Sequence, residues 1–161
     1  MTKIIILSDI HFNAVNLKKI DKIILESDYC FFLGDGGNAM ANYQDRLGGR
    51  LITLRGNCDF WARAETKDEA LLDIDGFKIL ATHGHKYGVK LSLDNLVNRA
   101  KQLKADIALF GHTHIAYLGY IGNILLVNPG SLGSPRIGAP SYAYMLLSLA
   151  QKPLVKIVEV K

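Results

Sequence analysis

The stretch KIIILSDIHFNAVNLKKIDKIILESDYCFFL, residues 3–33, decides the fold class. It opens on the apolar run Lys3–Leu7 and closes on a second one, Tyr29–Leu33. Between them, Leu17–Glu26 carries leucine and isoleucine at helical spacing, and Asn16 is expected to cap that helix. Strands that are apolar throughout are typical of a parallel sheet covered on both faces, so the stretch predicts a βαβ unit.

The rest of the chain predicts mostly strands. Asp75-Gly76 between two apolar runs favours a hairpin, and the last third shows no helical pattern. The expected strands are Leu51–Leu54, Ala70–Ile74, Phe77–Ala81, Ile107–Phe110, Ile115–Ile121, Ile124–Asn128, Tyr142–Leu149 and Leu154–Val160, with a helix at Asp94–Lys104 and a helix or a loop over 61–68. Together these elements predict an α/β fold, in which two mixed β-sheets pack as a sandwich flanked by helices, in a single domain over residues 1–161.

Composition narrows the class of protein. The chain has 161 residues, of which 49% are hydrophobic and 21% charged, as expected of a globular domain. Its net charge of +4 is dispersed, so nucleic acid is a possible partner but not a favoured one. The apolar runs are too short to cross a membrane, and the start of the chain shows no cleavable signal. Cys30 and Cys58 are placed too differently for a disulfide framework. We therefore expect a cytoplasmic protein without a membrane partner, and its oligomeric state is left open.

All five histidines fall in short clusters where apolar runs end. Two further polar segments follow strand-like runs in the same way. Since open α/β sheets bind ligands at the strand ends, we expect the segments to gather at one edge. Imidazole, carboxylate and amide oxygen together suit first-row transition metals. The segments are Ser8–His11, Gly34–Gly36, Gly56–Asp59, Thr82–His85 and Gly111–His114.

These segments resemble, in their order, the motifs of the calcineurin-like metallophosphoesterase superfamily. Asn57-Cys58-Asp59 and the segment Asn128–Ser131 are similar to its small prokaryotic phosphodiesterase branch. The motifs run from residue 9 to residue 131, so the resemblance covers most of the chain. A single Asp-x-His or Gly-Asp pair occurs often by chance, whereas five motifs in register, each after an expected strand, are specific.

The resemblance implies a centre of two divalent metal ions. Manganese is the first expectation for carboxylate and imidazole ligands, and iron, nickel or zinc are also possible. A shared anionic ligand is needed because two neighbouring cations repel each other. By resemblance, Asp9, His11 and His114 would hold the first metal, Asn57, His83 and His112 the second, and Asp35 would bridge the pair.

Each of these residues has a plainer interpretation when it is taken alone. Asp9 and Asp35 could cap turns or helices after strands, and Asn57 could form an Asx-turn. His83 and His112 could be core histidines with satisfied hydrogen bonds. Seven such residues at separate strand ends favour the metal centre over these interpretations.

The implied reaction is hydrolysis of a phosphodiester bond in a small-molecule substrate, with attack by a metal-bound hydroxide. Asp35, Asn57 and His85 are the expected catalytic residues. His85 could contact the substrate, reach a metal through its carbonyl oxygen, or orient a ligand, and these roles stay open.

Cys58 departs from the pattern of many relatives, which carry at this position a histidine that protonates the leaving group. A thiol is a poor acid at neutral pH, so the sequence predicts a preference for good leaving groups such as aryl oxygens. Whether Cys58 or His85 donates a proton stays open. Asp59 is expected to support the neighbouring ligands.

Two other functions are considered. The superfamily includes a retromer subunit that works mainly as a binding module, so a non-catalytic protein-interaction scaffold of the same fold is one alternative. A nuclease or a cyclic-nucleotide phosphodiesterase is the other, although the short chain offers no obvious capping domain or basic stripe. The full ligand set favours catalysis.

Overall fold

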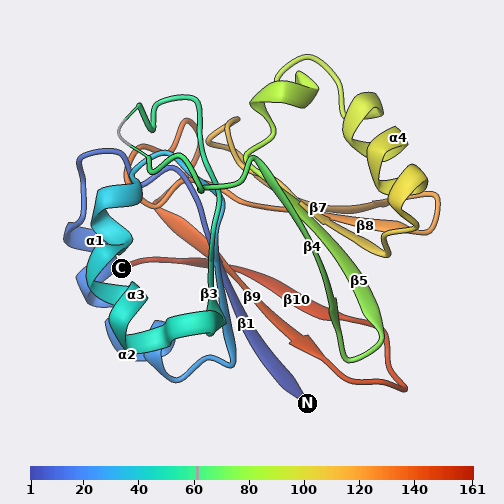
Figure 1. Cartoon of the computed structure of the whole chain (residues 1–161), viewed down its shortest axis with the longest axis horizontal. Coiled ribbons are helices and arrows are strands. Elements are labelled where there is room, and N and C mark those ends of the chain that lie inside the picture. The colour runs from blue at the N-terminus through green and yellow to red at the C-terminus, as the bar shows by residue number, and fades with distance from the viewer. Residues whose placement is uncertain (61) are drawn as a thin grey trace.

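The computed structural model describes residues 1–60 and 62–161, and these form two five-stranded sheets packed face to face (Figure 1). The first sheet has the order β10-β9-β1-β2-β3 and the second the order β4-β5-β6-β8-β7. The strands of the first sheet are β1 (Thr2–Leu7), β2 (Tyr29–Phe32), β3 (Leu51–Thr53), β9 (Ser141–Leu147) and β10 (Leu154–Glu159). Those of the second are β4 (Glu69–Ile74), β5 (Phe77–Thr82), β6 (Ile107–Leu109), β7 (Ala116–Ile121) and β8 (Ile124–Pro129).

Both sheets mix parallel and antiparallel pairs. Strand β1 lies parallel to β2, with Ile5 opposite Cys30, and antiparallel to β9, with Ile5 opposite Tyr144. In the second sheet β5, β6 and β8 are parallel, and β4 and β7 run antiparallel at its edges. The prediction of an α/β fold with two mixed sheets is therefore confirmed.

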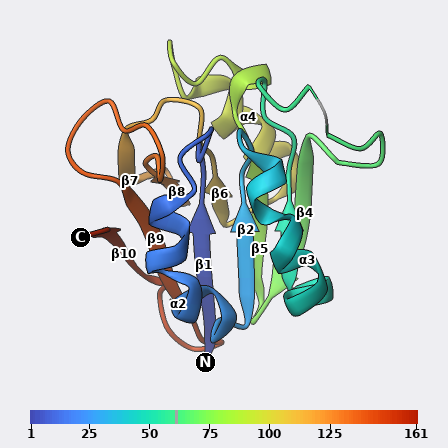
Figure 2. The same ribbon diagram turned by 90° about the vertical axis from the view of Figure 1, so that its left-hand side faces the viewer.

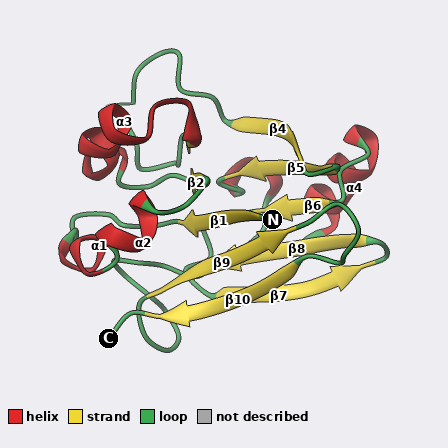
Figure 3. Cartoon of the chain, turned by 90° about the horizontal axis from the view of Figure 1, so that it is seen from below, coloured by secondary structure: helices red, strands yellow, loops and turns green. Residues whose placement is uncertain are grey.

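The helices cover the outer faces of the two sheets (Figures 2 and 3). The first sheet is covered by α1 (Val15–Lys19), α2 (Asp21–Leu25) and α3 (Ala41–Leu47), with the short 3₁₀ helices η1 (Gly37–Met40) and η2 (Gly48–Arg50) beside α3. The second sheet is covered by α4 (Asp94–Leu103), which the 3₁₀ helix η3 (His85–Tyr87) precedes. None of the helices in the described part of the chain is long and apolar enough to cross a membrane.

The alternation of side chains along β1 explains why its sequence is apolar at every position. Ile4 and Ile6 point into the cluster between the two sheets, where Ile79 and Ile107 of the second sheet also lie. Ile5 and Leu7 point the other way, into the cluster beneath the helices. Because both faces are covered, each of these side chains is 0% exposed, and burying each one contributes about 1.5–3 kcal/mol.

Two predictions for the βαβ unit are wrong in detail. The single helix expected over Leu17–Glu26 is divided at Ile20 into α1 and α2. Asn16 is not a helix cap, since it lies inside α1 after the N-cap residue Ala14. Its buried amide instead donates to the carbonyl oxygen of Leu132 at 2.9 Å, because a buried amide without a partner is costly.

Other differences concern the segments before and after β3. Helix α3 was not predicted, although its buried residues Tyr43 and Leu47 lie four positions apart. For 61–68, Trp61 lies outside the described residues, and 62–68 contains turns and a bridge between Lys67 and Leu54 but no helix.

Glu69 on β4 connects three parts of the second sheet's outer layer. Its carboxylate accepts hydrogen bonds from the Tyr87 hydroxyl and from the Arg99 guanidinium on α4. The hydrogen bond from Arg99 holds the pKa of Glu69 below its usual range. Because the folded state favours the charged carboxylate, its contribution to stability is full above the ordinary Glu pKa of about 4.3 and is lost as the pH falls through the lower folded value.

We predict that Glu69→Gln lowers the free energy of unfolding by about 0.5–1 kcal/mol at neutral pH, a small effect because the pair is partly solvated. The difference from the parent protein should be smaller at an acidic pH below the ordinary Glu pKa of about 4.3, where the carboxylate begins to take up a proton. Urea denaturation at both pH values measures it, with Glu65→Gln as the control, since Glu65 is exposed and its contact with Arg63 is 3.9 Å long. An equal loss at both pH values would contradict the role of the charge.

Candidate metal centre

The five polar segments of the sequence meet at one end of the sandwich. Asp9, Asp35 and Asn57 come from the loops after β1, β2 and β3 of the first sheet. His83 follows β5, and the segment with His112 and His114 follows β6, both in the second sheet. The candidate ligands therefore come from both sheets and converge where their strand ends meet.

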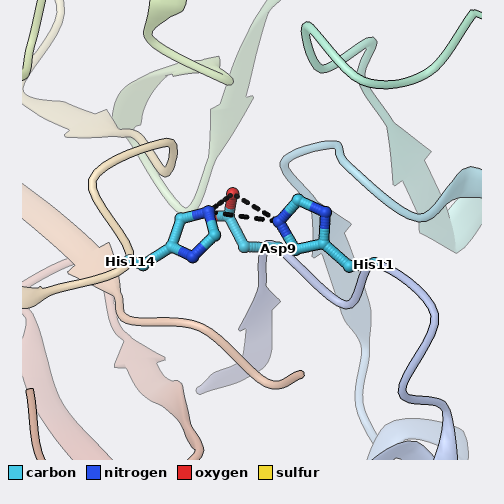
Figure 4. Close-up of side chains that lie close together, drawn as sticks. All are labelled: Asp9, His11 and His114. Carbon is cyan, nitrogen blue, oxygen red and sulfur yellow. Dashed lines mark hydrogen bonds and ion pairs between the residues drawn. The ribbon is translucent and has the colours of Figure 1, made fainter. Parts of the chain in front are cut away.

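Asp9, His11 and His114 form the first group (Figure 4). Asp9 Oδ1 lies 3.0 Å from His114 Nε2 and 3.9 Å from His11 Nε2, and the two Nε2 atoms are 3.1 Å apart. The Asp9 carboxylate is buried, whereas the two imidazoles are partly exposed. A cation placed among these three atoms would be reached from the loop surface.

Hydrogen bonds around the first group leave its inner atoms free. Asp9 Oδ2 accepts from Ser8 Oγ at 2.6 Å and from the backbone N–H of His112 at 3.0 Å, while Oδ1 accepts no hydrogen bond from the residues that the structure describes. His114 Nδ1 donates to the carbonyl oxygen of Ser134 at 2.7 Å, which leaves a lone pair on Nε2. The closeness of Asp9 raises the pKa of His114, because the two facing lone pairs favour a positive charge between them.

Asp35, His83 and His112 form the second group, and Asn57 joins it. His83 Nδ1 donates to the carbonyl oxygen of Leu33 at 2.8 Å, so its Nε2 carries a lone pair. That nitrogen faces Asn57 Oδ1 at 3.1 Å and Asp35 Oδ2 at 3.4 Å. Three acceptors facing one another again fit a cation.

The charge states of the second group are set by burial and by neighbours. Burial would raise the pKa of Asp35, but His83 and the N–H of Cys58 outweigh it and hold that pKa well below its usual range. Burial opposes a proton on His83, although Asp35 raises its pKa overall. Burial, assisted by His83, lowers the pKa of His112 to about 4. At neutral pH this group therefore holds a carboxylate and a neutral His112 imidazole, both able to bind a metal.

Asp35 lies between the two groups. One of its carboxylate oxygens belongs with His83 and His112, and one belongs with a further set formed by His11 and Cys58, within 4.8 Å in each set. His11 is a member of the first group, so Asp35 shares a set with members of both groups.

The backbone is strained at most of these positions. Five candidate ligands have a left-handed backbone conformation, which costs an L-residue roughly 1–2 kcal/mol. Such strain persists only where the surrounding structure holds it, and it gathers at functional sites. The φ angles are 55° at Asp9, 51° at His11, 61° at Asp35, 67° at His112 and 60° at His114.

Two glycines allow the loops to approach the carboxylates. A Cβ atom on Gly56 would lie 2.0 Å from Asp35 Oδ1, and one on Gly111 would lie 2.0 Å from Ser8 Oγ. Neither position can accept a side chain without moving a buried polar group. The glycines in front of Asn57 and His112 are thus required by the packing of the site.

Asp59 and Asn128 hold the loops together. The Asp59 carboxylate accepts three backbone N–H bonds of 2.8 Å, from Asp35, Gly36 and Gly56, and so joins the loops after β2 and β3. Asn128 Nδ2 donates to the carbonyl oxygen of Gly111 at 3.1 Å and to Thr113 Oγ1 at 3.0 Å. Both side chains support neighbouring ligands, as the sequence predicted for Asp59.

His85 stands apart from the groups described above. Its ring centroid lies 5.3 Å from that of His83 and 6.0 Å from that of His112, and its buried Nδ1 has no hydrogen bond in the part of the chain that the structure describes. It lines a cavity of about 550 Å³, together with Arg55, Gly56, Asn57, Asp59, Phe60, Ala62, Ala64, Asp68 and Lys86. Asn57 belongs both to this cavity and to the second group.

Sequence reasoning missed the residues that orient the ligands. Ser8 and Ser131 are both buried, and Ser131 Oγ donates to the carbonyl oxygen of Asp9 at 2.7 Å. The position of Ser8 directly before Asp9 was a signal, because a serine at the end of an apolar strand is seldom a packing residue. The carbonyl oxygens of Leu33 and Ser134 gave no signal, since every residue carries one.

The chain is similar in sequence to known proteins. The model of the calcineurin-like phosphoesterase superfamily domain matches residues 2–152. The probable metallophosphoesterase YsnB of Bacillus subtilis is 45% identical over 95 residues, which are 58% of this chain and 55% of YsnB. The phosphodiesterase YfcE of Escherichia coli K12 is 27% identical over 173 residues, covering 91% of this chain and 88% of YfcE.

Solved structures show the same fold. A conserved protein of Streptococcus pneumoniae TIGR4, described as a predicted phosphoesterase, superposes with a TM-score of 0.79 at 26% identity, over 99% of this chain and 92% of that one. A single mutant of Vps29 from Entamoeba histolytica gives a TM-score of 0.78 at 19% identity, over 99% of both chains, and this likeness concerns the fold alone. With its sandwich of two mixed sheets and a family match over nearly its whole length, the chain belongs to the calcineurin-like phosphoesterase superfamily, in the branch of small bacterial and archaeal phosphoesterases.

Proposed function

We propose that the protein is a metal-dependent phosphodiesterase that holds two divalent cations and hydrolyses small-molecule phosphodiesters. The observation that carries the proposal is the convergence of ligand atoms from separate loops: Asp9 Oδ1 with His114 Nε2, and Asp35 Oδ2 with Asn57 Oδ1 and His83 Nε2. Carboxylate oxygens close to imidazole nitrogens favour a positive charge among them, and a divalent cation supplies it.

The proposed ligands are those implied by the family resemblance, and the distances support them. Asp9, His11 and His114 would hold one cation and Asn57, His83 and His112 the other, with Asp35 bridging. Manganese is the proposed metal because oxygen and imidazole donors make up both groups, and iron, nickel or zinc would also fit. When bound, the two cations would supply Lewis-acid activation of water and neutralise charge on the phosphoryl group.

The chain's own residues would position the substrate. The cavity beside Asn57 and His85 is open to receive an organic group of the diester, with Phe60 and Ala62 on its wall. We propose that His85 contacts the substrate there, because its Nδ1 has no hydrogen bond within residues 1–60 and 62–161. The name of the relative YfcE supports a diester over a monoester as substrate. Free Cys30 and Cys58 support action in the cytoplasm.

The scaffold alternative is less well supported. The likeness to Vps29 concerns the fold and does not separate a catalyst from a binding module. The strained backbone at five candidate ligands favours chemistry, because such strain gathers at functional sites. Polynucleotide substrates are not favoured, since the net charge is only +4.

The bridging role of Asp35 predicts a joint effect on both metals. Asp35→Asn keeps the size of the side chain and removes the shared negative charge, so both cations should bind at least about 100-fold more weakly, since even partners outside the ligand set cost 10–100-fold. Titration calorimetry with Mn²⁺ and hydrolysis of bis(p-nitrophenyl) phosphate measure the two losses. Asp73→Asn, at an exposed site on β4, is the control. If Asp35→Asn binds two cations normally and hydrolyses the diester at the parent rate, Asp35 does not bridge.

The thiol at position 58 predicts a dependence on the leaving group. Burial and the charge of Asp35 raise the pKa of Cys58, so the thiol is an even weaker proton donor than a free cysteine. The parent enzyme should therefore hydrolyse an aryl phosphodiester faster than an alkyl one of similar size. Cys58→His should narrow the gap, because a general acid contributes about 10²–10⁴-fold on a poor leaving group. Equal parent rates on both diesters, with chemistry rate-limiting, would count against this account.

Removal and return of metal separates an enzyme from a scaffold. Chelator-treated protein should regain diesterase activity in proportion to the Mn²⁺ it binds, and His112→Ala should abolish that recovery while circular dichroism shows an intact fold. His112 is suited to this test because it belongs to one group only. Full loading with no hydrolysis across a broad panel of diesters would falsify the catalytic function.

A further inference from the structure

Cys58 lies beside two side chains, His11 and Asp35, that are proposed ligands of the two-cation centre. Its Sγ, a ring nitrogen of His11 and a carboxylate oxygen of Asp35 all lie within 4.8 Å of one another. Cys58 is exposed and forms no disulfide. The set differs from the two groups of the proposed centre because it adds sulfur to nitrogen and oxygen.

We propose that His11, Asp35 and Cys58 form a second mode of binding, specific for soft divalent cations such as Cd²⁺. Thiolate ligands select such ions, whereas carboxylate ligands suit Mn²⁺. The Mn²⁺ centre of the proposed function also needs His11 and Asp35. The two modes of binding therefore exclude each other. On binding, the S–H bond of Cys58 breaks, the sulfur binds the cation, and the proton passes to solvent.

The surroundings of Cys58 fix its sulfur near the two shared ligands. The backbone N–H of Cys58 donates to Asp35 Oδ1 at 2.7 Å, which holds this residue against the carboxylate. Asn57 Nδ2 donates to Cys58 Sγ at 3.3 Å. A sulfur that already accepts an N–H bond keeps this support when it carries a negative charge, as a metal-bound thiolate does.

The exposure of Cys58 and the negative charge of the carboxylates behind it also favour binding of a cation at the sulfur. The Asp35 and Asp9 carboxylates are both buried, and the side chain of Cys58 is the exposed part of the cluster. A soft cation arriving from solvent would therefore meet the sulfur first and the buried oxygens behind it. Cys30 offers no such site, because it is 0% exposed in the core under the helices.

The consequence for the reaction rests on the proposed function. A soft cation held by Cys58 withdraws His11 and Asp35 from the hydrolytic arrangement, so Cd²⁺ should inhibit an Mn²⁺-loaded enzyme. The binding mode itself does not depend on any activity, and it is tested by a spectroscopic signal.

Cd²⁺ titrated into the chelator-treated full-length protein should produce the ultraviolet charge-transfer absorption of a cadmium–thiolate bond, with one thiolate per chain. Cys58→Ser should remove the band, and the control Cys30→Ala should keep it. The proposal is overturned if the band survives in Cys58→Ser, or if the parent binds Cd²⁺ by equilibrium dialysis and shows no band. Circular dichroism of each variant establishes that it is folded.

Affinity and competition test the shared ligands. Cys58→Ser should weaken Cd²⁺ binding at least about tenfold and change Mn²⁺ binding less than about threefold, because only the soft ion uses the sulfur. Saturating Mn²⁺ should raise the Cd²⁺ concentration at which the band is half complete. If both affinities fall equally, or if Mn²⁺ has no effect on the band, the two modes do not compete as proposed.

These outcomes separate the two proposals. A cadmium–thiolate band at Cys58 without Mn²⁺-dependent hydrolysis would leave the binding mode standing and reject the proposed function. Mn²⁺-dependent hydrolysis without the cadmium–thiolate band would support the proposed function and reject the binding mode.

Discussion

The close approach of carboxylate, amide and imidazole atoms from separate loops is the constraint around which this end of the molecule is built. Asp9 Oδ1 and His114 Nε2 lie 3.0 Å apart, and His83 Nε2 lies 3.1 Å from Asn57 Oδ1. Hydrogen bonds on the outer side hold three of these side chains: Asp9 Oδ2 accepts from Ser8 and from a backbone N–H, and His83 and His114 each donate from Nδ1 to a carbonyl oxygen. The strands and loops hold these side chains in place, and a cation bound among them would attract their oxygen and nitrogen atoms.

Holding these side chains in place requires backbone conformations that are unfavourable at several residues. Left-handed aspartates and histidines are unfavourable locally, and Gly56 and Gly111 give up side chains so that two loops can come close. The apolar sheets offset this cost. Both faces of β1 are covered, and the cluster between the sheets draws residues from nearly every strand. The unfavourable geometry is thus confined to the loops, while the strands that carry them are held by burial.

Much of the fold and of the candidate site could be predicted from the sequence, because the signals were local. The apolar runs of β1 and β2 and the hairpin at Asp75-Gly76 are properties of short segments, and the polar residues directly after them marked the strand ends. The rest depended on distant partners. The bond of Asn16 to Leu132 joins residues 116 positions apart, and no local pattern announces it. The tautomers of His83 and His114 are likewise set by carbonyl oxygens from other loops.

Each candidate group takes its ligands from both sheets. Asp9 and His11 follow β1 while His114 follows β6, and Asp35 follows β2 while His83 follows β5. An ion bound in either group would therefore work as a staple across the sandwich, joining two layers whose strands share no backbone hydrogen bonds. Since unfolding separates the layers, it must also release the ion, and the binding energy is added to the stability of the fold. The concentration of free metal would then affect the stability of the folded protein as well as the occupancy of the site.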